Sequence, residues 1–101
     1  EMALTGDFCS AGRAYEMGLV NRVVEAGSAL DAARTLAATI GANGPLAVKV
    51  SKQVVVQSAD WDSQECWAKQ SAMVTPIFTS EDAIEGATAF AEKRAPNWKG
   101  R

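Results

Sequence analysis

The sequence contains no histidine. This absence excludes Ser–His and Cys–His nucleophile pairs and His-ligated metal sites within the chain. Its two cysteines, Cys9 and Cys66, stand apart without the paired spacing of a zinc or redox site, and they are too few for a disulfide framework. We therefore expect no metal site and a reducing, cytoplasmic environment.

The chain also lacks an excess of basic residues and any apolar run of the length that a membrane-spanning helix needs. Ten lysines and arginines stand against 12 aspartates and glutamates, for a net charge of −2. Nucleic acids and anionic membranes are therefore not expected as partners. Hydrophobic residues make up 48% of the 101 residues and charged residues 22%, which predicts a folded chain no larger than one domain.

Helical signals dominate the first half of the chain. Ser10 is placed to cap a short helix that ends near Met17, with Gly18 as its left-handed terminating residue. Residues 19–24 are apolar and β-branched, which favours one short extended segment. A capping-box pattern at Ser28 and an apolar stripe at helical spacing then predict a helix that ends near Gly41.

The second half predicts three further helices. Pro45 suits a first helical position, and the period of Leu46, Val50 and Val54 favours a helix although the valine run 54–56 favours a strand. The next helix is expected to begin at Asp60 or Asp62, and to carry Trp61, Trp67 and Val74. Pro76 should then break the chain.

The last helix has the clearest boundaries. Thr79 and Asp82 resemble a capping box, and Glu81 suits the positive end of the helix dipole. Lys93 and Arg94 suit the negative end of the helix dipole. Pro96 should close the helix.

The sequence motifs of this chain fall in three stretches. The first is Leu-Thr-Gly-Asp at 4–7, then Ala11 and Ala14, then Gly-Leu-Val-Asn-Arg-Val-Val at 18–24. The second is Gly-Pro-Leu-Ala at 44–47 with Lys52. The third is Phe-Thr-Ser-Glu-Asp at 78–82 with Glu-Gly at 85–86, Ala-Phe at 89–90, Glu-Lys-Arg at 92–94, Pro96 and Trp98. Together these motifs and their spacing resemble the C-terminal third of the enoyl-CoA hydratase/isomerase (crotonase) superfamily. The resemblance covers essentially the whole chain.

The resemblance implies a mainly α fold class, namely the helical C-terminal (oligomerisation) region of a crotonase-type α/β spiral fold. Residues 1–101 would form a single segment of this kind, with the catalytic domain upstream of it. In this family, two upstream backbone amides stabilise the thioester enolate. In the hydratases, two glutamates, also upstream, activate water. We therefore expect no catalytic residue in this chain, and Glu1 and Glu16 match no catalytic glutamate.

The resemblance implies coenzyme A contacts at Phe90 and Lys93. In the family, the matching residues lie near the adenine and phosphate end of coenzyme A. An aromatic ring and an ammonium group are physically suitable partners for these groups. The alternative is that the basic residues Lys93, Arg94, Lys99 and Arg101 only complement the helix terminus. The three tryptophans are expected to be packing residues at helix contacts or subunit interfaces.

Two functions remain open on the sequence. In the first, the chain belongs to an enoyl-CoA hydratase-like lyase that acts on an acyl-CoA substrate in fatty-acid breakdown, without a separate cofactor; an isomerase is a related option. In the second, the chain is a non-catalytic self-association module, as in the trimers and hexamers of this family. The second describes the isolated chain better, because its apolar helix stripes lack partners.

Overall fold

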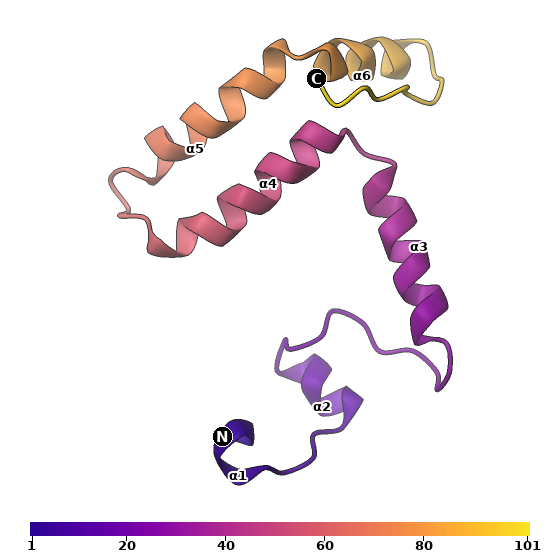
Figure 1. Ribbon diagram of the computed structural model, residues 1–101, viewed down its shortest axis with the longest axis vertical. Coiled ribbons are helices and arrows are strands. Elements are labelled where there is room, and N and C mark those ends of the chain that lie inside the picture. The colour runs from indigo at the N-terminus through magenta and orange to yellow at the C-terminus, as the bar shows by residue number, and fades with distance from the viewer. The chain divides into compact units, whose positions relative to one another are not determined.

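The computed structural model describes residues 1–101 and is helical, with no β-strand, as the predicted mainly α fold class requires. The elements are α1 (Met2–Thr5), α2 (Ala11–Glu16), α3 (Ala29–Gly41), α4 (Pro45–Gln57), the 3₁₀ helix η1 (Ser58–Asp60), α5 (Cys66–Val74), the 3₁₀ helix η2 (Thr75–Thr79) and α6 (Glu81–Ala91) (Figure 1). The chain divides into two units, Glu1–Leu36 and Ala37–Arg101, with the division inside α3. No helix is both long and apolar enough to cross a bilayer.

The first unit contains the short helix that the sequence predicts. The hydroxyl of Ser10 accepts the amide of Arg13 at 3.1 Å, which caps the start of α2. Gly18 ends the helix with a φ of 74°, a left-handed conformation that glycine adopts without steric cost. The segment 19–24 lies outside the helices and pairs with no strand.

The apolar stripe of α3 is not covered. The helix begins where the sequence predicts, with the carbonyl of Ser28 accepting the amide of Ala32 at 3.0 Å. Leu36 is half-buried, but Leu30 and Ile40 on the same stripe stay exposed. These side chains are the kind that a folded protein normally buries against another element.

In the second unit, α4 packs against α5. The predicted stripe of Leu46, Val50 and Val54 is half-buried, while Val55 and Val56 are exposed. The helical period therefore prevails over the strand preference of the valine run.

The helix α5 begins later than predicted. The carboxylate of Asp62 accepts the amide of Gln64 at 2.7 Å, which forms a turn rather than a helix start. Trp61 therefore precedes the helix, which begins at Cys66. The predicted break is confirmed, because α5 passes into the 3₁₀ helix η2 at Pro76.

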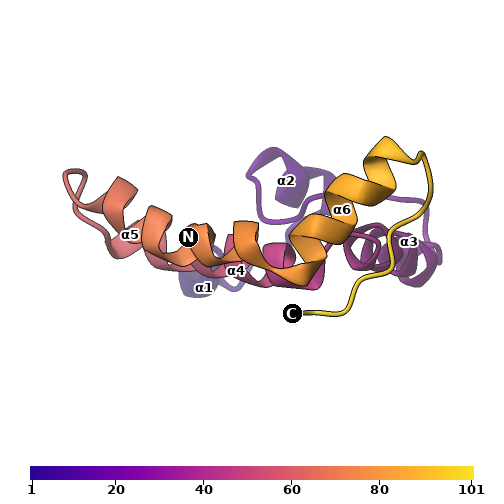
Figure 2. The ribbon, with the colours of Figure 1, turned by 90° about the horizontal axis from the view of Figure 1, so that it is seen from above.

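The start of α6 is displaced by one residue from the prediction. Ser80, not Thr79, is the N-cap, and its hydroxyl accepts the amide of Ala83 at 3.0 Å. The hydroxyl of Thr79 instead donates to the carbonyl of Pro76. After α6, the chain turns and runs back beside the helix to the C-terminus (Figures 1 and 2).

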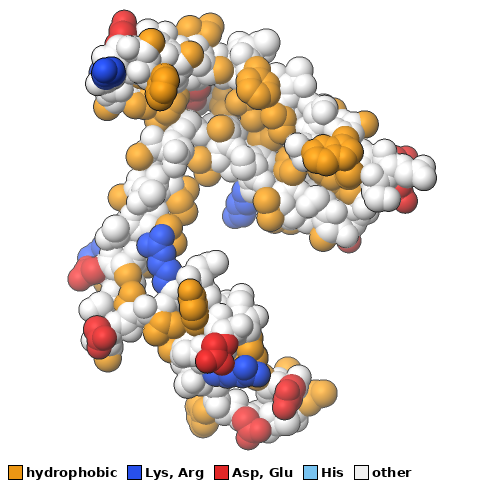
Figure 3. Space-filling view, turned by 180° about the vertical axis from the view of Figure 1, so that it is seen from behind, with side chains coloured by type: hydrophobic (Ala, Val, Ile, Leu, Met, Phe, Trp, Pro, Cys, Tyr) orange, Lys and Arg blue, Asp and Glu red, His pale blue; other side chains and the backbone are white.

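Few apolar side chains are buried in either unit. Only Ala14 and Ala89 among them are buried, and hydrophobic side chains are spread over the surface (Figure 3). The accessible area is 8231 Å². Two separate compact bodies of these sizes would together expose about 6,500 Å². The chain thus leaves apolar surface open that a self-sufficient domain would bury.

Candidate functional site

The C-terminal end of α6 forms a Schellman turn at Lys93. The amide of Lys93 donates to the carbonyl of Phe90 at 3.3 Å, and the amide of Arg94 donates to the carbonyl of Ala89 at 3.0 Å. Lys93 has a φ of 54° and is the single non-glycine residue with a positive φ. The same turn after α2 uses Gly18 at the equivalent position. A lysine there pays a steric cost of roughly 1.5 kcal/mol that a glycine does not, because its Cβ crowds the backbone.

Glu85 holds the residues that follow this turn. Its Oε1 accepts a hydrogen bond from Nη1 of Arg94 at 2.6 Å, and its Oε2 accepts one from Nη2 of Arg94 at 3.0 Å. Oε1 also accepts a hydrogen bond from the amide of Asn97 at 2.7 Å. The Arg94 side chain, followed by the Asn97 amide, lowers the pKa of Glu85 to about 2. Glu85 is thus a carboxylate that stays ionised and ties the residues after α6 to the middle of the helix.

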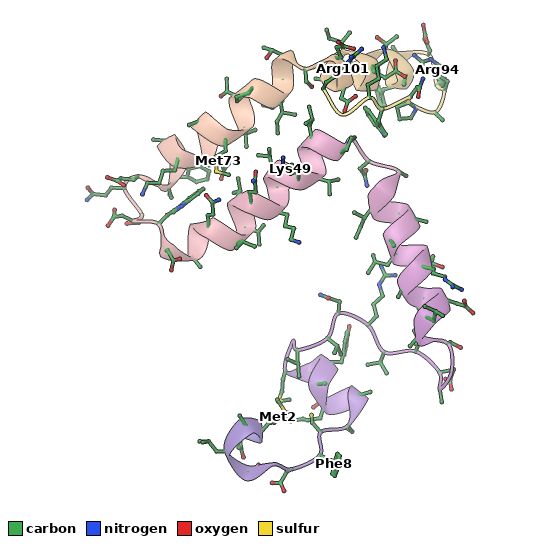
Figure 4. All side chains as sticks on the ribbon, viewed as in Figure 1. Met2, Phe8, Lys49, Met73, Arg94 and Arg101 are labelled. Carbon is green, nitrogen blue, oxygen red and sulfur yellow. The ribbon has the colours of Figure 1, made fainter.

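Asp82 holds the last residues of the chain. The segment 95–101, which we call the C-terminal strap, lies along α6 with Arg94 at its turn and Arg101 beside the start of the helix (Figure 4). The carboxylate of Asp82 accepts the amides of Lys99 at 2.7 Å and Gly100 at 2.9 Å, and its own amide donates to the carbonyl of Arg101 at 3.1 Å. Asp82 is 4% exposed, so these bonds satisfy a buried charge.

Trp98 anchors the strap to the loop before α4 and to α6. Its indole nitrogen donates to the carbonyl of Ala42 at 2.9 Å. Its ring lies over Gly86, where a Cβ would come within 3.1 Å of the ring carbon Cη2. Glycine at position 86 therefore permits this close approach. The expectation that Trp98 is a packing residue is confirmed, with the contact made inside the unit.

The two residues expected at coenzyme A lie three positions apart at this end of α6. Phe90 is 88% exposed, so its ring is available for a ligand or another protein surface. Lys93 differs from the other three basic residues near the C-terminus. Arg94 pairs with Glu85 and Glu92, and Lys99 and Arg101 pair with Glu81, whereas Lys93 forms no ion pair.

The strap contacts were not predicted from the sequence. Glu81, Asp82 and Glu85 are explained by helix capping and the dipole when read on α6 alone. In the structure, all three hold residues that follow the helix. A usable signal is the pattern of acids at neighbouring helical positions ahead of a basic tail, because residues three and four apart share a helix face.

No group of Cys, Asp and Glu side chains is arranged to hold a metal ion. Glu16, one of the two carboxylates considered for catalysis, pairs with Arg13 at 3.3 Å on an exposed face of α2. Glu1 is exposed at the start of the chain. Glu1 lines an open hollow of the first unit together with Asp7 and Arg13.

Comparisons with known proteins place these helices in a family. The sequence model described as enoyl-CoA hydratase/isomerase matches residues 1–101. The chain is 42% identical over 101 residues to an enoyl-CoA hydratase of Mycobacterium tuberculosis, covering all of this chain and 38% of that protein. It is 40% identical over 105 residues to the carnitinyl-CoA dehydratase of Proteus mirabilis, covering all of this chain and 40% of that protein.

A solved structure is similar to this chain. The crystal structure of an enoyl-CoA hydratase from Mycobacterium marinum matches with a TM-score of 0.92 and 54% identity, over 98% of this chain and 39% of that chain. The chain thus spans about two fifths of the length of the relatives it matches. A family model that matches every residue and a crotonase-fold neighbour at high identity agree with the resemblance found in the motifs. The chain belongs to the enoyl-CoA hydratase/isomerase family, in the crotonase superfamily.

Proposed function

We propose that this chain is the C-terminal part of an enoyl-CoA hydratase-like lyase, which adds water to 2-enoyl-CoA thioesters in fatty-acid or related acyl-CoA breakdown. The match of the family model to residues 1–101 carries this proposal. The relatives named enoyl-CoA hydratase and carnitinyl-CoA dehydratase support chemistry on CoA thioesters. The catalytic glutamates and the oxyanion amides would lie in the preceding part of the enzyme.

Within that enzyme, Phe90 and Lys93 would contact the adenine and phosphate end of coenzyme A. Lys93 supports this role because it is the basic residue of the tail whose ammonium has no acidic partner. An unpaired ammonium is suited to an anionic phosphate, and the exposed ring of Phe90 is suited to stacking on adenine. The left-handed backbone of Lys93 also supports it, because such strained conformations cluster at ligand-binding positions.

Binding energy at this distant end of the substrate acts equally on the ground state and the transition state unless it is used for orientation. Loss of such uniform binding raises KM and leaves kcat unchanged. In the full-length enzyme, Lys93→Ala should raise the Kd for coenzyme A about tenfold, the size of one charge-assisted hydrogen bond. It should also reduce the salt dependence of binding. Titration calorimetry at two ionic strengths measures both effects.

The matched control for this experiment is Lys99→Ala. It removes the same charge from the same tail, but at a residue that pairs with Glu81. Its Kd should stay within about twofold of the wild type. An unchanged Kd in Lys93→Ala would refute the coenzyme A contact. Crotonyl-CoA hydration, tested beside isomerisation and carnitinyl-CoA dehydration, identifies the reaction of the full-length enzyme.

A second candidate function is self-association, and the exposed apolar surface favours it. Phe78, Val55 and Trp67 are exposed, and the stripe of α3 is open. Surface of this kind associates with other copies or with the rest of a protein. Size-exclusion chromatography with light scattering on the isolated chain should show a trimer or a larger assembly. The isolated chain should not hydrate crotonyl-CoA; a well-behaved monomer would contradict self-association.

A further inference from the structure

We propose that Glu85 is a positioning residue for Lys93, and that it holds the ammonium of Lys93 where the phosphate groups of coenzyme A bind. This inference rests on the function proposed above. Glu85 forms no ion pair with Lys93 itself. It acts through the residues that follow, because its carboxylate bonds the guanidinium of Arg94 and the amide of Asn97.

The geometry explains how a carboxylate eight positions away can orient Lys93. The two hydrogen bonds of the Schellman turn require a left-handed residue at position 93, and lysine adopts that conformation at a cost. Strained conformations persist only where the surrounding contacts over-determine them. The paired bonds from Glu85 to Arg94, with the further bond to Asn97, supply such contacts immediately after the strained residue.

The other end of the strap supports the same turn. Asp82 bonds two amides near the C-terminus, and Trp98 bonds the carbonyl of Ala42. Residues 94–101 are therefore held at both ends, which limits the freedom of the turn. Glu85 is the contact nearest to Lys93 in this set. Its loss would release the turn while the rest of the strap stays attached.

Electrostatics alone predicts the opposite effect from positioning. Glu85 is a negative charge near a site proposed for an anionic ligand, so its neutralisation should strengthen binding of coenzyme A if charge is all that matters. If Glu85 positions Lys93, its neutralisation should weaken binding. The direction of the change in Kd therefore separates the two explanations.

The experiment is a double-mutant cycle in the full-length enzyme, with coenzyme A as the probe. Glu85→Gln should raise the Kd about fivefold and raise the KM for crotonyl-CoA similarly, with kcat within about twofold. In the Lys93→Ala background, Glu85→Gln should change the Kd by less than about 1.5-fold, because the group it positions is absent. Retention of the weakening in that background would show a general structural role and would overturn the inference.

The matched control is Glu92→Gln, which removes the same charge directly before Lys93. Glu92 bonds Nε of Arg94 but has no bond to Asn97. Its Kd should be unchanged or lower. A weakening as large as that of Glu85→Gln, or an unchanged Kd in Glu85→Gln, would overturn the proposal.

Two further results keep the test decisive. If Glu85→Gln does not fold, Arg94→Lys enters the same cycle, because it keeps the charge and removes the paired bonds to Glu85. It should weaken binding in the presence of Lys93 and not in its absence. If Lys93→Ala alone leaves the Kd unchanged, the proposed coenzyme A contact fails first. If only the coupling is missing, the contact stands and the positioning role fails.

Discussion

Replacement of Lys93 by glycine should stabilise the end of α6 while weakening binding of coenzyme A. Lys93 is held with a φ of 54°, and the Schellman turn after α2 shows glycine in the equivalent place. A left-handed residue with a Cβ costs roughly 1.5 kcal/mol. The greater freedom of glycine in the open state offsets about 0.8 kcal/mol of this. The expected net gain is thus about 0.7 kcal/mol, or about threefold in the local opening equilibrium.

The assay for this prediction is amide hydrogen exchange in the full-length protein. The amide of Arg94, which donates to the carbonyl of Ala89, reports opening of the turn directly. Its exchange should be about threefold slower in Lys93→Gly than in the wild type. Lys93→Ala is the control, because alanine removes the ammonium and keeps the Cβ. It should show no gain in protection.

Binding of coenzyme A separates the two roles of the residue. Lys93→Gly and Lys93→Ala should weaken binding equally, by about tenfold, because both lack the ammonium. Equal exchange rates at Arg94 in the two variants would refute the reasoning, since they would show that the backbone of Lys93 carries no strain. A gain in local stability together with a loss of affinity in Lys93→Gly is expected if lysine at this position serves binding at the expense of stability.

Three further predictions concern the strap. Gly86→Val should displace the ring of Trp98 and destabilise the second unit by about 1–3 kcal/mol, measured by tryptophan fluorescence during denaturation, whereas Ala87→Val is the control on the same helix. Asp82→Asn should release the end of the chain, because the NH2 group that replaces one carboxylate oxygen donates and cannot accept the backbone amide bonded there. Carboxypeptidase should then remove residues faster than in the wild type, and equal rates would contradict this role. The pKa of Glu85 is lowered to about 2 from 4.5, so its contribution to stability is complete above pH 4.5 and is lost as the pH falls toward 2. NMR of the Asn97 amide should therefore change only below pH 4.5, and a change centred near neutral pH would contradict the assignment.

Local sequence signals predicted the helices well where their causes are local. Ser10 caps α2, Gly18 ends it, and Pro76 ends α5 in the places expected. These features depend on one residue and its near neighbours, so they can be read along the chain. The errors also have local causes: Ser80 competes with Thr79 for the cap of α6, and Asp62 forms a turn before α5 begins.

The candidate site was predictable in part. The family motif predicts coenzyme A contacts at Phe90 and Lys93, and the structure adds that the Phe90 ring is exposed and that Lys93 forms no ion pair. The part played by Glu85 could not be read from α6 alone, because its partners follow the helix. Its role depends on how the chain turns at Lys93.

The sequence by itself determined the family, the helical character and most helix boundaries, because motifs, caps and apolar periods are local properties of the chain. Only the tertiary structure decided which charges of the C-terminal residues pair and that Lys93 forms no ion pair. Asp82 meets Gly100, and Trp98 meets the carbonyl of Ala42, across separations along the chain that no helical period encodes. Such pairings arise when the strap folds back on α6, and the attraction between charges depends on that distance in space and not on their order in sequence.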